Sequence, residues 1–421
     1  MSVKSVLKEQ ILLVKPEKEV IGRIKEISKD FIDRLNSKLR SSEINADVFV
    51  GGSFAKNTLV KKDKYDVDIF VRFSWEYETL SDDLEPVIKK ICNEIKKPYE
   101  RVHGSRDYFK INIDKNLELE VIPVTKIKKP IEERNVTDLS YFHVSYVKKQ
   151  GKKISDDIIL AKAFCHGQKV YGAESYINGF SGYALECLVI HYKSFEKMLK
   201  ELVKVKERIV IDPAKHFKRK NNVFFELSEN KLQSPVILID PTYKERNALA
   251  ALNHETFLKF QKSAKKFLKK PSKKFFVGQE IDIKKLMKTK KGEFVHVKLK
   301  TDKQPGDIAG TKLKKFSKWL EKETSKYFKI AQTEFEYDQN DIADFYLIAK
   351  SKKEIIRIGP PLKMKKHVKA FKRENKKTFE KNGLIHSKVK IDFNLKDFIQ
   401  NVKKERKNIV KEMGITKIDI S

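Results

Sequence analysis

Asp66 and Asp68 are the two residues of this sequence best placed to hold a metal ion. They stand in a segment, residues 65–73, whose apolar and polar residues alternate as in a half-buried β-strand. Side chains two positions apart on a strand point to the same face, so the two carboxylates lie about 7 Å apart along the backbone. Because hard divalent cations prefer oxygen ligands, the pair predicts a site for such a cation. The alternative is a strand with two solvated aspartates.

A glycine-rich turn precedes this strand. Gly51 and Gly52 let the backbone approach a ligand closely, and Ser53 is predicted to cap a short helix after the turn. The free N–H groups at a helix N-terminus bind phosphate groups. The turn therefore predicts a triphosphate cradle next to the metal-binding pair.

A second alternating run, residues 117–123, offers further carboxylates. Glu118 and Glu120 share one face of this expected strand, opposite the apolar residues. A third carboxylate beside Asp66 and Asp68 would complete a site for two metal ions. The competing interpretation is a half-exposed strand with two solvated glutamates.

The elements that must position these groups follow from the hydrophobic pattern. Apolar residues at helical spacing predict helices within residues 1–40 and 82–97, which would cover a sheet that includes a strand at 46–50. Residues 188–202 are predicted as one long amphipathic segment and residues 255–270 as a helix. We expect a domain boundary near residue 271. The pattern is typical of an α/β (α+β) protein.

The C-terminal part alternates strand-like and helical segments. Residues 363–382 contain nine Lys or Arg among twenty residues, with apolar residues interleaved. This pattern predicts a basic stripe that follows RNA phosphates, and a solvated helix face is the alternative.

The charge balance favours a polyanionic partner. The chain has 421 residues, 91 Lys and Arg against 58 Asp and Glu, and a formal net charge of +33. Such an excess favours nucleic acid, because phosphate neutralisation dominates that binding. A membrane surface is the competing polyanion, but no segment reads as an interfacial anchor. A Lys-rich bias of the source organism would also contribute to the charge.

The number and spacing of the cysteines indicate the kind of cellular compartment. The chain has three cysteines, and they form no CxxC pair, which argues against a disulfide framework or a zinc site and suits a reducing compartment. There is no apolar run near 18 residues. We expect a cytoplasmic protein that does not bind membranes.

Several motifs carry a family resemblance. Gly52-Ser53, Asn57-Thr58 and Asp66-x-Asp68 resemble the signature of the DNA polymerase beta-like nucleotidyltransferase superfamily. Later motifs are similar to those of archaeal-type (class I) CCA-adding enzymes: Asp138-x-x-x-Phe142-His143, Lys162, residues 170–174 and 179–183, Ile239-Asp240-Pro241, Arg246-Asn247 and Gly359-Pro360-Pro361. These motifs cover nearly the whole chain in the family's order.

The resemblance implies three domains and one reaction. It places a nucleotidyltransferase head with a mixed sheet at residues 1–145, a helical neck at 146–270 and a basic α/β tRNA-binding tail at 271–421. The implied reaction adds C, C and A to the 3′ end of tRNA from CTP and ATP, with Mg²⁺ and without a nucleic-acid template. A homodimer is left open.

The resemblance also assigns metal ligands. Asp66, Asp68 and Glu120 match the positions that bind the metal ions, and Glu120 stands three residues before Pro123, where the family usually has Asp. The longer Glu side chain changes the expected metal geometry but keeps the ligand chemistry.

The nucleotide contacts follow from the same resemblance. Ser53 and Lys56 match positions that contact the triphosphate, with Lys56 where Arg is frequent. His143, Lys162 and Tyr171 match positions around the phosphates and the sugar, and Arg246 matches the residue that reads the base. The alternatives are surface lysines, a structural histidine, a core tyrosine, and a structural ion pair of Arg246 with Asp240.

Other functions compete with this interpretation. The head motifs also fit other RNA-tailing transferases, such as a poly(A) polymerase or an oligoadenylate synthetase. A non-catalytic RNA-binding protein is the third hypothesis, and the intact Asp66 and Asp68 argue against it.

Overall fold

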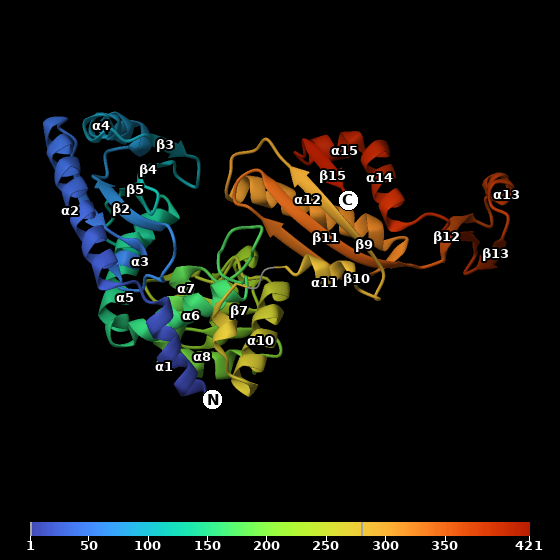
Figure 1. Cartoon of the computed structure of the whole chain (residues 1–421), viewed down its shortest axis with the longest axis horizontal. Helices are drawn as coiled ribbons and strands as arrows, with labels where there is room; N and C mark the ends of the chain where they lie inside the picture. Colours follow the sequence, from blue (N-terminus) through green and yellow to red (C-terminus); the bar gives the residue numbers. More distant parts are fainter. Residues whose placement is uncertain (1, 279–280) are drawn as a thin grey trace. The chain divides into compact units, whose positions relative to one another are not determined.

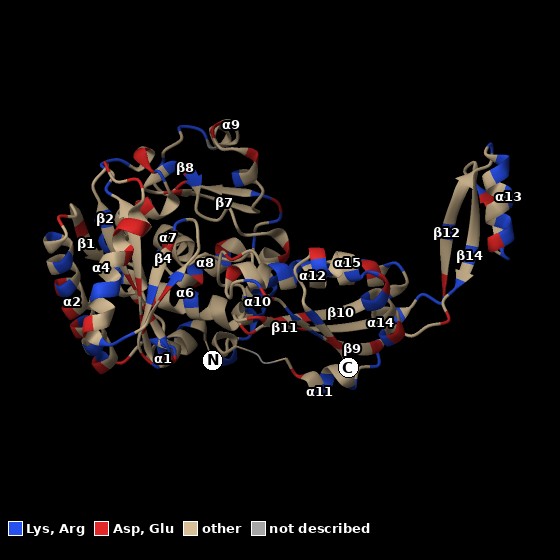
Figure 2. Ribbon diagram, turned by 90° about the horizontal axis from the view of Figure 1, so that it is seen from above, with Lys and Arg blue, Asp and Glu red and all other residues tan. Residues whose placement is uncertain are grey.

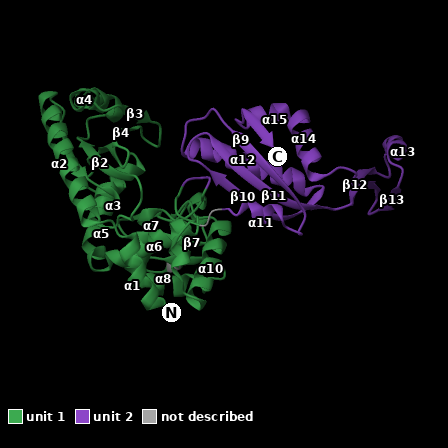
Figure 3. Cartoon of the chain, viewed as in Figure 1, with its two compact units in different colours: residues 1–173, 177–279 green, residues 174–176, 280–421 purple. Residues whose placement is uncertain are grey.

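The computed structural model describes residues 2–278 and 281–421. The chain forms two compact units, residues 1–173 with 177–279 and residues 174–176 with 280–421 (Figure 3). The described helices include none that is long and apolar enough to cross a membrane.

The first half of unit 1 is built on a five-stranded mixed sheet of order β1-β2-β5-β4-β3 (Figure 1). The strands are β1 (Ala46–Val50), β2 (Tyr65–Phe73), β3 (Tyr99–Val102), β4 (Tyr108–Asp114) and β5 (Leu117–Thr125). β2 and β5 run parallel, and the other neighbours are antiparallel.

Helices α2 (Lys18–Ser41) and α4 (Leu80–Ile95) cover one face of this sheet. Val67 and Ile69 of β2 point into the resulting core and are fully buried, as the alternation predicts. Asp66 and Asp68 therefore lie on the opposite face, which these two helices leave uncovered. The sequence correctly predicted which face of β2 carries the carboxylates.

The second half of unit 1 is mainly helical, around a separate hydrophobic cluster. Its helices are α1 (Val3–Val14), α5 (Ser140–Gly151), α6 (Ser155–Gly167), α7 (Gly182–Tyr192), α8 (Phe195–Leu202) and α10 (His254–Lys269). A three-stranded sheet of β6 (Ile209–Ile211), β7 (Val236–Asp240) and β8 (Tyr243–Asn247) lies in the same half, with the short α9 (Val223–Glu226). A domain boundary at residue 145 stays a prediction.

The single amphipathic segment expected at residues 188–202 is two helices. Lys193 ends α7 in the left-handed conformation, with φ of 67°, and the Ser194 side chain accepts a hydrogen bond from the Lys197 N–H to start α8. A serine N-cap inside the run was the signal that periodicity alone did not include.

Unit 2 contains a four-stranded antiparallel sheet of order β10-β11-β9-β15. Its elements are α11 (Ile283–Met287), β9 (Glu293–Lys300), α12 (Asp307–Ser325), β10 (Phe328–Tyr337), β11 (Ile342–Ser351), α14 (Leu395–Glu405), α15 (Lys407–Glu412) and β15 (Lys417–Ile420). α12 and α14 pack on the sheet through one apolar cluster.

A separate three-stranded sheet in unit 2 carries the basic stretch. It consists of β12 (Glu354–Pro361), β14 (Leu384–Lys390) and β13 (Thr378–Lys381), with helix α13 (Lys365–Glu374). Lys and Arg cover much of α13 (Figure 2), and none of its residues is buried. The expected basic helix therefore ends at Glu374, and the stretch continues into strand β13.

Candidate active site

Strand pairing brings the predicted carboxylates together. In the parallel register of β2 and β5, Asp68 stands opposite Glu120 and Asp66 opposite Glu118. Burial and the charges of Glu120 and Asp66 raise the pKa of Asp68 to about 7. Burial also raises the pKa of Glu120, against the opposing effect of Lys110. Carboxylates that repel each other in this way favour the approach of a cation.

Lysines neutralise the outer carboxylates. Lys62 forms an ion pair with Asp66, and Lys110 Nζ lies 3.0 Å from Glu120 Oε1. Within the described residues, no three His, Cys, Asp or Glu side chains are arranged as ligands of one metal ion. The set Asp66, Asp68 and Glu120 supplies only carboxylate oxygens, which is the chemistry that Mg²⁺ takes.

Glu118 has a different environment from Glu120. It is buried, and its carboxylate pairs with Lys64 at 2.7 Å and with Lys110 at 3.3 Å. The interpretation as two solvated glutamates is therefore wrong for this residue. Its register partner is Asp66, whereas Glu120 is the partner of the central Asp68.

The glycine turn is locked against β2. Gly52 has φ of +58°, and a Cβ there would lie 1.6 Å from Asp68 Oδ2. A Cβ on Gly51 would lie 2.1 Å from the Phe70 ring, and the Gly51 N–H donates to the Asp68 carbonyl at 2.8 Å. Both positions need glycine, one for conformation and contact and the other for contact.

The capping role expected of Ser53 is wrong. Helix α3 spans Gly52–Ala55, its N-cap is Gly51, and no side chain caps it. Ser53 is instead the second residue of the helix, and its carbonyl accepts the Thr58 N–H at 2.9 Å. Gly52, with φ of +58°, already begins the helix one residue before Ser53, so the N-cap position falls on Gly51.

Lys56 and Lys162 meet on one buried carboxylate that the sequence interpretation missed. Lys56 Nζ lies 2.7 Å from Glu186 Oε2, and Lys162 Nζ lies 2.7 Å from Glu186 Oε1. Burial raises the pKa of Glu186, but the two lysines lower it to about 2. Neither lysine is the solvated surface group that was the alternative. A lone glutamate in the apolar helix α7 was the available signal, because a buried charge needs a partner.

His143 and Arg246 meet on a second buried carboxylate, Asp240. His143 Nε2 lies 3.0 Å and Arg246 Nη1 2.8 Å from Asp240 Oδ2, and the Tyr183 hydroxyl donates to Oδ1 at 2.9 Å. Burial raises the pKa of Asp240, but His143 and Arg246 lower it by more, to well below its usual range. The ion pair that was the alternative for Arg246 is present.

Tyr183 joins the two groups of side chains. Its ring stacks on His143 with centroids 3.9 Å apart. Lys56 Nζ lies 6.0 Å and the Arg246 guanidinium 5.7 Å from its centroid. The sequence analysis included this residue only in the family motif at residues 179–183 and assigned it no role.

The Tyr171 side chain lies against Gly182, the first residue of α7. A Cβ on Gly182 would lie 2.6 Å from the Tyr171 hydroxyl oxygen and 3.8 Å from Lys162 Cε, so both side chains border this glycine. The Tyr171 ring stacks on His166 with centroids 3.7 Å apart. Burial, together with Lys62 and Lys162, lowers the pKa of His166 to about 4, so this histidine is neutral near pH 7. His166 was not predicted.

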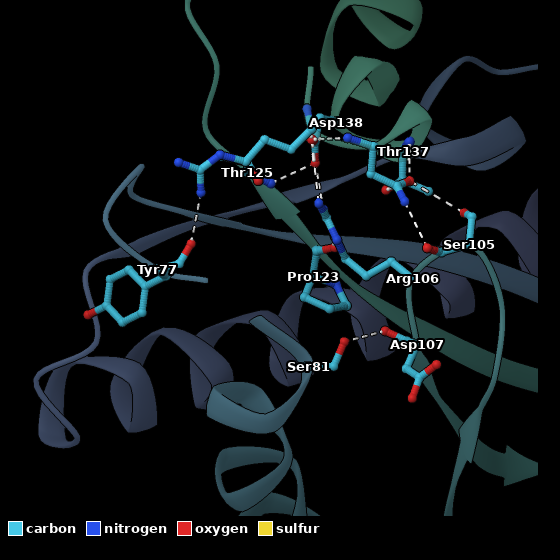
Figure 4. Close-up of polar contacts among 11 residues, drawn as sticks. Tyr77, Ser81, Ser105, Arg106, Asp107, Pro123, Thr125, Thr137 and Asp138 are labelled. Carbon is cyan, nitrogen blue, oxygen red and sulfur yellow. Dashed lines mark hydrogen bonds and ion pairs between the residues drawn. The ribbon is translucent and has the colours of Figure 1, made fainter. Parts of the chain in front are cut away.

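A buried network anchors the helix that carries His143 (Figure 4). Asp138 accepts hydrogen bonds from Arg106 Nη1 at 2.5 Å, from the Thr125 N–H at 2.8 Å and from the Arg134 and Asn135 N–H groups at 3.0 and 2.9 Å. This network ties the end of β5 to the start of α5. Asp138 therefore fixes the start of the helix that carries His143, the last residue of the same motif.

Known protein families match both halves of unit 1. The nucleotidyltransferase domain family matches residues 28–143, and the family described as tRNA nucleotidyltransferase, second domain, matches residues 156–277.

A solved structure of Cid1, described as having RNA terminal uridylyl transferase activity, superposes with a TM-score of 0.51 at 9% identity. It covers 66% of this chain and 99% of that chain. This likeness shows the fold alone.

Curated relatives are CCA-adding enzymes. That of Nanoarchaeum equitans is 41% identical over 232 residues, 55% of this chain, and the match spans only 58% of that enzyme's length. That of Saccharolobus islandicus (strain Y.G.57.14 / Yellowstone #1) is 30% identical over 344 residues, 80% of this chain and 76% of that enzyme. That of Methanocaldococcus jannaschii is 27% identical over 394 residues, 90% and 86% of the two chains. The chain belongs to the family of CCA-adding enzymes, the tRNA nucleotidyltransferases.

Proposed function

We propose that this enzyme adds C, C and A to the 3′ end of tRNA, using CTP and ATP and no nucleic-acid template. The observation that carries the proposal is that Asp68 and Glu120 stand opposite each other on adjacent strands, with the Gly51-Gly52 turn directly against Asp68. The curated relatives and the tRNA nucleotidyltransferase second-domain match favour this reaction over poly(A) or oligoadenylate synthesis.

The chemistry is an in-line displacement. The tRNA 3′ hydroxyl attacks the α-phosphorus, and pyrophosphate leaves. Asp66, Asp68 and Glu120 would hold Mg²⁺, which neutralises charge on the attacking and leaving oxygens when it is bound. Glu120, opposite Asp68 in the strand register, would bind the metal ion that activates this hydroxyl.

The nucleotide contacts come from both halves of unit 1. Gly52, Ser53 and Lys56 hold the triphosphate, and His143, Lys162 and Tyr171 lie toward the phosphates and sugar. Arg246 reads the base: it uses Nη1 on Asp240, and a guanidinium has five N–H donors in a planar fork, so donors are left for base acceptors.

The basic C-terminal part holds the tRNA. We assign the head to residues 1–145, the neck to 146–270 and the tRNA-binding tail to 271–421. Lysines on α13 contact phosphates, which gives affinity for the shape and backbone of duplex RNA rather than for its sequence. We expect the enzyme to act in the cytoplasm, and a homodimer stays a prediction.

The test uses three tRNA transcripts, which end before CCA, after C and after CC. Purified protein with Mg²⁺ receives CTP and ATP separately and together, and products are resolved at single-nucleotide length. The expected result is two C additions, then one A, then a stop. Long A tails would assign the protein to the polymerases. Binding of tRNA without any transfer would leave an RNA-binding protein.

A further inference from the structure

Glu186 occupies an unusual place in the candidate active site. It lies on α7, and its side chain is 0% exposed. Its Oε1 accepts from Lys162 Nζ at 2.7 Å and from Thr58 Oγ1 at 2.8 Å, and its Oε2 accepts from Lys56 Nζ at 2.7 Å. One carboxylate thus binds three side chains, one from helix α6 and two from the segment 56–58 after α3.

The two lysines need a shared anion. Their side chains are only 4% and 9% exposed for Lys162 and Lys56, so water screens their mutual repulsion poorly. Burial lowers the pKa of Lys162, and Glu186 acts against this effect. An uncompensated ammonium in such a place would tend to lose its proton.

The two lysines differ in how many of their ammonium N–H donors remain available to a ligand. Lys162 Nζ also donates to the Thr58 carbonyl at 3.3 Å and to Thr58 Oγ1 at 2.9 Å, which accounts for all three ammonium hydrogens. For Lys56, Glu186 is the acceptor found among the described residues. Lys56 therefore keeps donors for a ligand while Glu186 fixes its position.

We propose that Glu186 is a positioning residue for the triphosphate: it holds Lys56 and Lys162 together behind the Gly51-Gly52 turn before a nucleotide arrives. Thr58, the last residue of the Asn57-Thr58 motif, belongs to the same arrangement. This inference rests on the proposed function and names a residue that acts through the lysines rather than on the substrate.

A purely structural role for Glu186 predicts something different. It would change folding stability and, through it, the use of both substrates equally. A positioning role acts on the phosphates that leave as pyrophosphate, and not on tRNA. The KM for CTP and the inhibition constant of pyrophosphate should therefore change together, with the KM for tRNA unchanged.

The test compares Glu186→Gln with wild type in the full chain. The glutamine keeps the shape of the side chain and removes its charge. We expect the KM for CTP and the inhibition constant of pyrophosphate to rise about tenfold or more, as loss of one close charge interaction would give. The KM for tRNA should stay within twofold.

A matched control is Asp157→Asn, also a carboxylate of the helical half. Asp157 accepts the Phe195 N–H at 2.8 Å and has no ion pair in the described part of the chain. It should change stability without changing the KM for CTP relative to that for tRNA. If Glu186→Gln does not fold, Glu186→Asp keeps the charge but is shorter, and the same comparison decides.

Two results would end the inference. One is a parallel rise of the KM for CTP and the KM for tRNA, and the other is an unchanged inhibition constant of pyrophosphate in a folded variant. Wild-type protein that transfers no nucleotide would instead overturn the proposed function, so the two failures are distinguishable.

Discussion

Asp68 and Glu120 stand directly opposite each other on the adjacent parallel strands β2 and β5. A parallel pair needs a long crossover, here residues 74–116 with α4, β3 and β4. The two carboxylates are therefore distant in sequence, and their approach depends on the whole sheet being in register. A slip of one residue would turn one of them to the apolar face.

Asp68→Asn should separate activity from stability. We expect kcat to fall by about 10³-fold, since an essential ligand of the proposed metal site is lost. The melting temperature should not fall, because burial and neighbouring carboxylates disfavour the charge of Asp68 in the folded protein. Single-turnover assays and thermal unfolding measure the two effects. A large loss of stability would contradict the electrostatic account.

Gly52→Ala should damage both the fold and the site. The position has φ of +58°, and the new Cβ would collide with Asp68 Oδ2. We expect a loss of about 1–3 kcal/mol of stability and at least about a hundredfold loss of kcat/KM. The control is Gly22→Ala: Gly22 lies inside α2 with nothing within 4 Å of an added Cβ. It should stabilise the protein by about 0.5–1 kcal/mol, as measured by urea unfolding.

Asp240→Asn should destabilise unit 1. The change removes the buried charge that forms an ion pair with Arg246 and contacts His143 Nε2. Breaking such an arrangement by removing one partner costs about 3–5 kcal/mol. Equilibrium denaturation gives the value. Tyr183→Phe, which removes one hydrogen bond to the same carboxylate, should cost only about 1 kcal/mol, and equal losses for the two variants would refute the ranking.

The contribution of Glu186 to folding stability should depend on pH. Its pKa is lowered to about 2 in the folded protein, from an ordinary value of 4.5. The folded state therefore favours the charged form, so the contribution is present above about pH 4.5 and is lost as the pH falls toward 2. The difference in unfolding free energy between wild type and Glu186→Gln should shrink over this window. A difference that stays constant would show that the charge is not responsible.

Changing Lys365, Lys366 and Lys369 of α13 to Gln should weaken tRNA binding alone. These side chains are exposed, so the melting temperature should stay the same. Each lost phosphate contact should reduce the slope of log affinity against log salt by about 0.7–0.9. Filter binding at several salt concentrations measures the slope. The control changes Lys18, Lys25 and Lys29, exposed lysines of α2, and should leave the slope unchanged; equal effects would indicate non-specific attraction.

Local patterns predicted the strands and the positions of the carboxylates, because alternation and glycine turns are local properties. The strand assignments for Asp66, Asp68 and Glu120 rest on such signals. The partners of Lys56 and His143 could not be predicted in this way. Glu186 and Asp240 are far from them in sequence, and only the packing of helices and sheets brings each buried charge to its counterion.

The two wrong predictions of local structure, for Ser53 and for residues 188–202, also arose from local signals. Ser53 was expected to cap α3, but the left-handed Gly52 is already the first residue of the helix, and Gly51 is its N-cap. One segment became two helices at Lys193, since a capping serine competes with continued periodicity. In both places a single residue's backbone preference overrode the pattern of its neighbours.

The carboxylate of Glu186 also connects the two halves of unit 1. Lys56 and Thr58 belong to the sheet half of unit 1, between β1 and β2, whereas Lys162 and Glu186 come from its helical half. A chimaera that kept this sheet half but took the helices of another transferase would leave Lys56 without its counterion unless an acid occupied the same place on α7. Exchange of halves between such enzymes is therefore constrained by one buried charge, in addition to the shape of the interface.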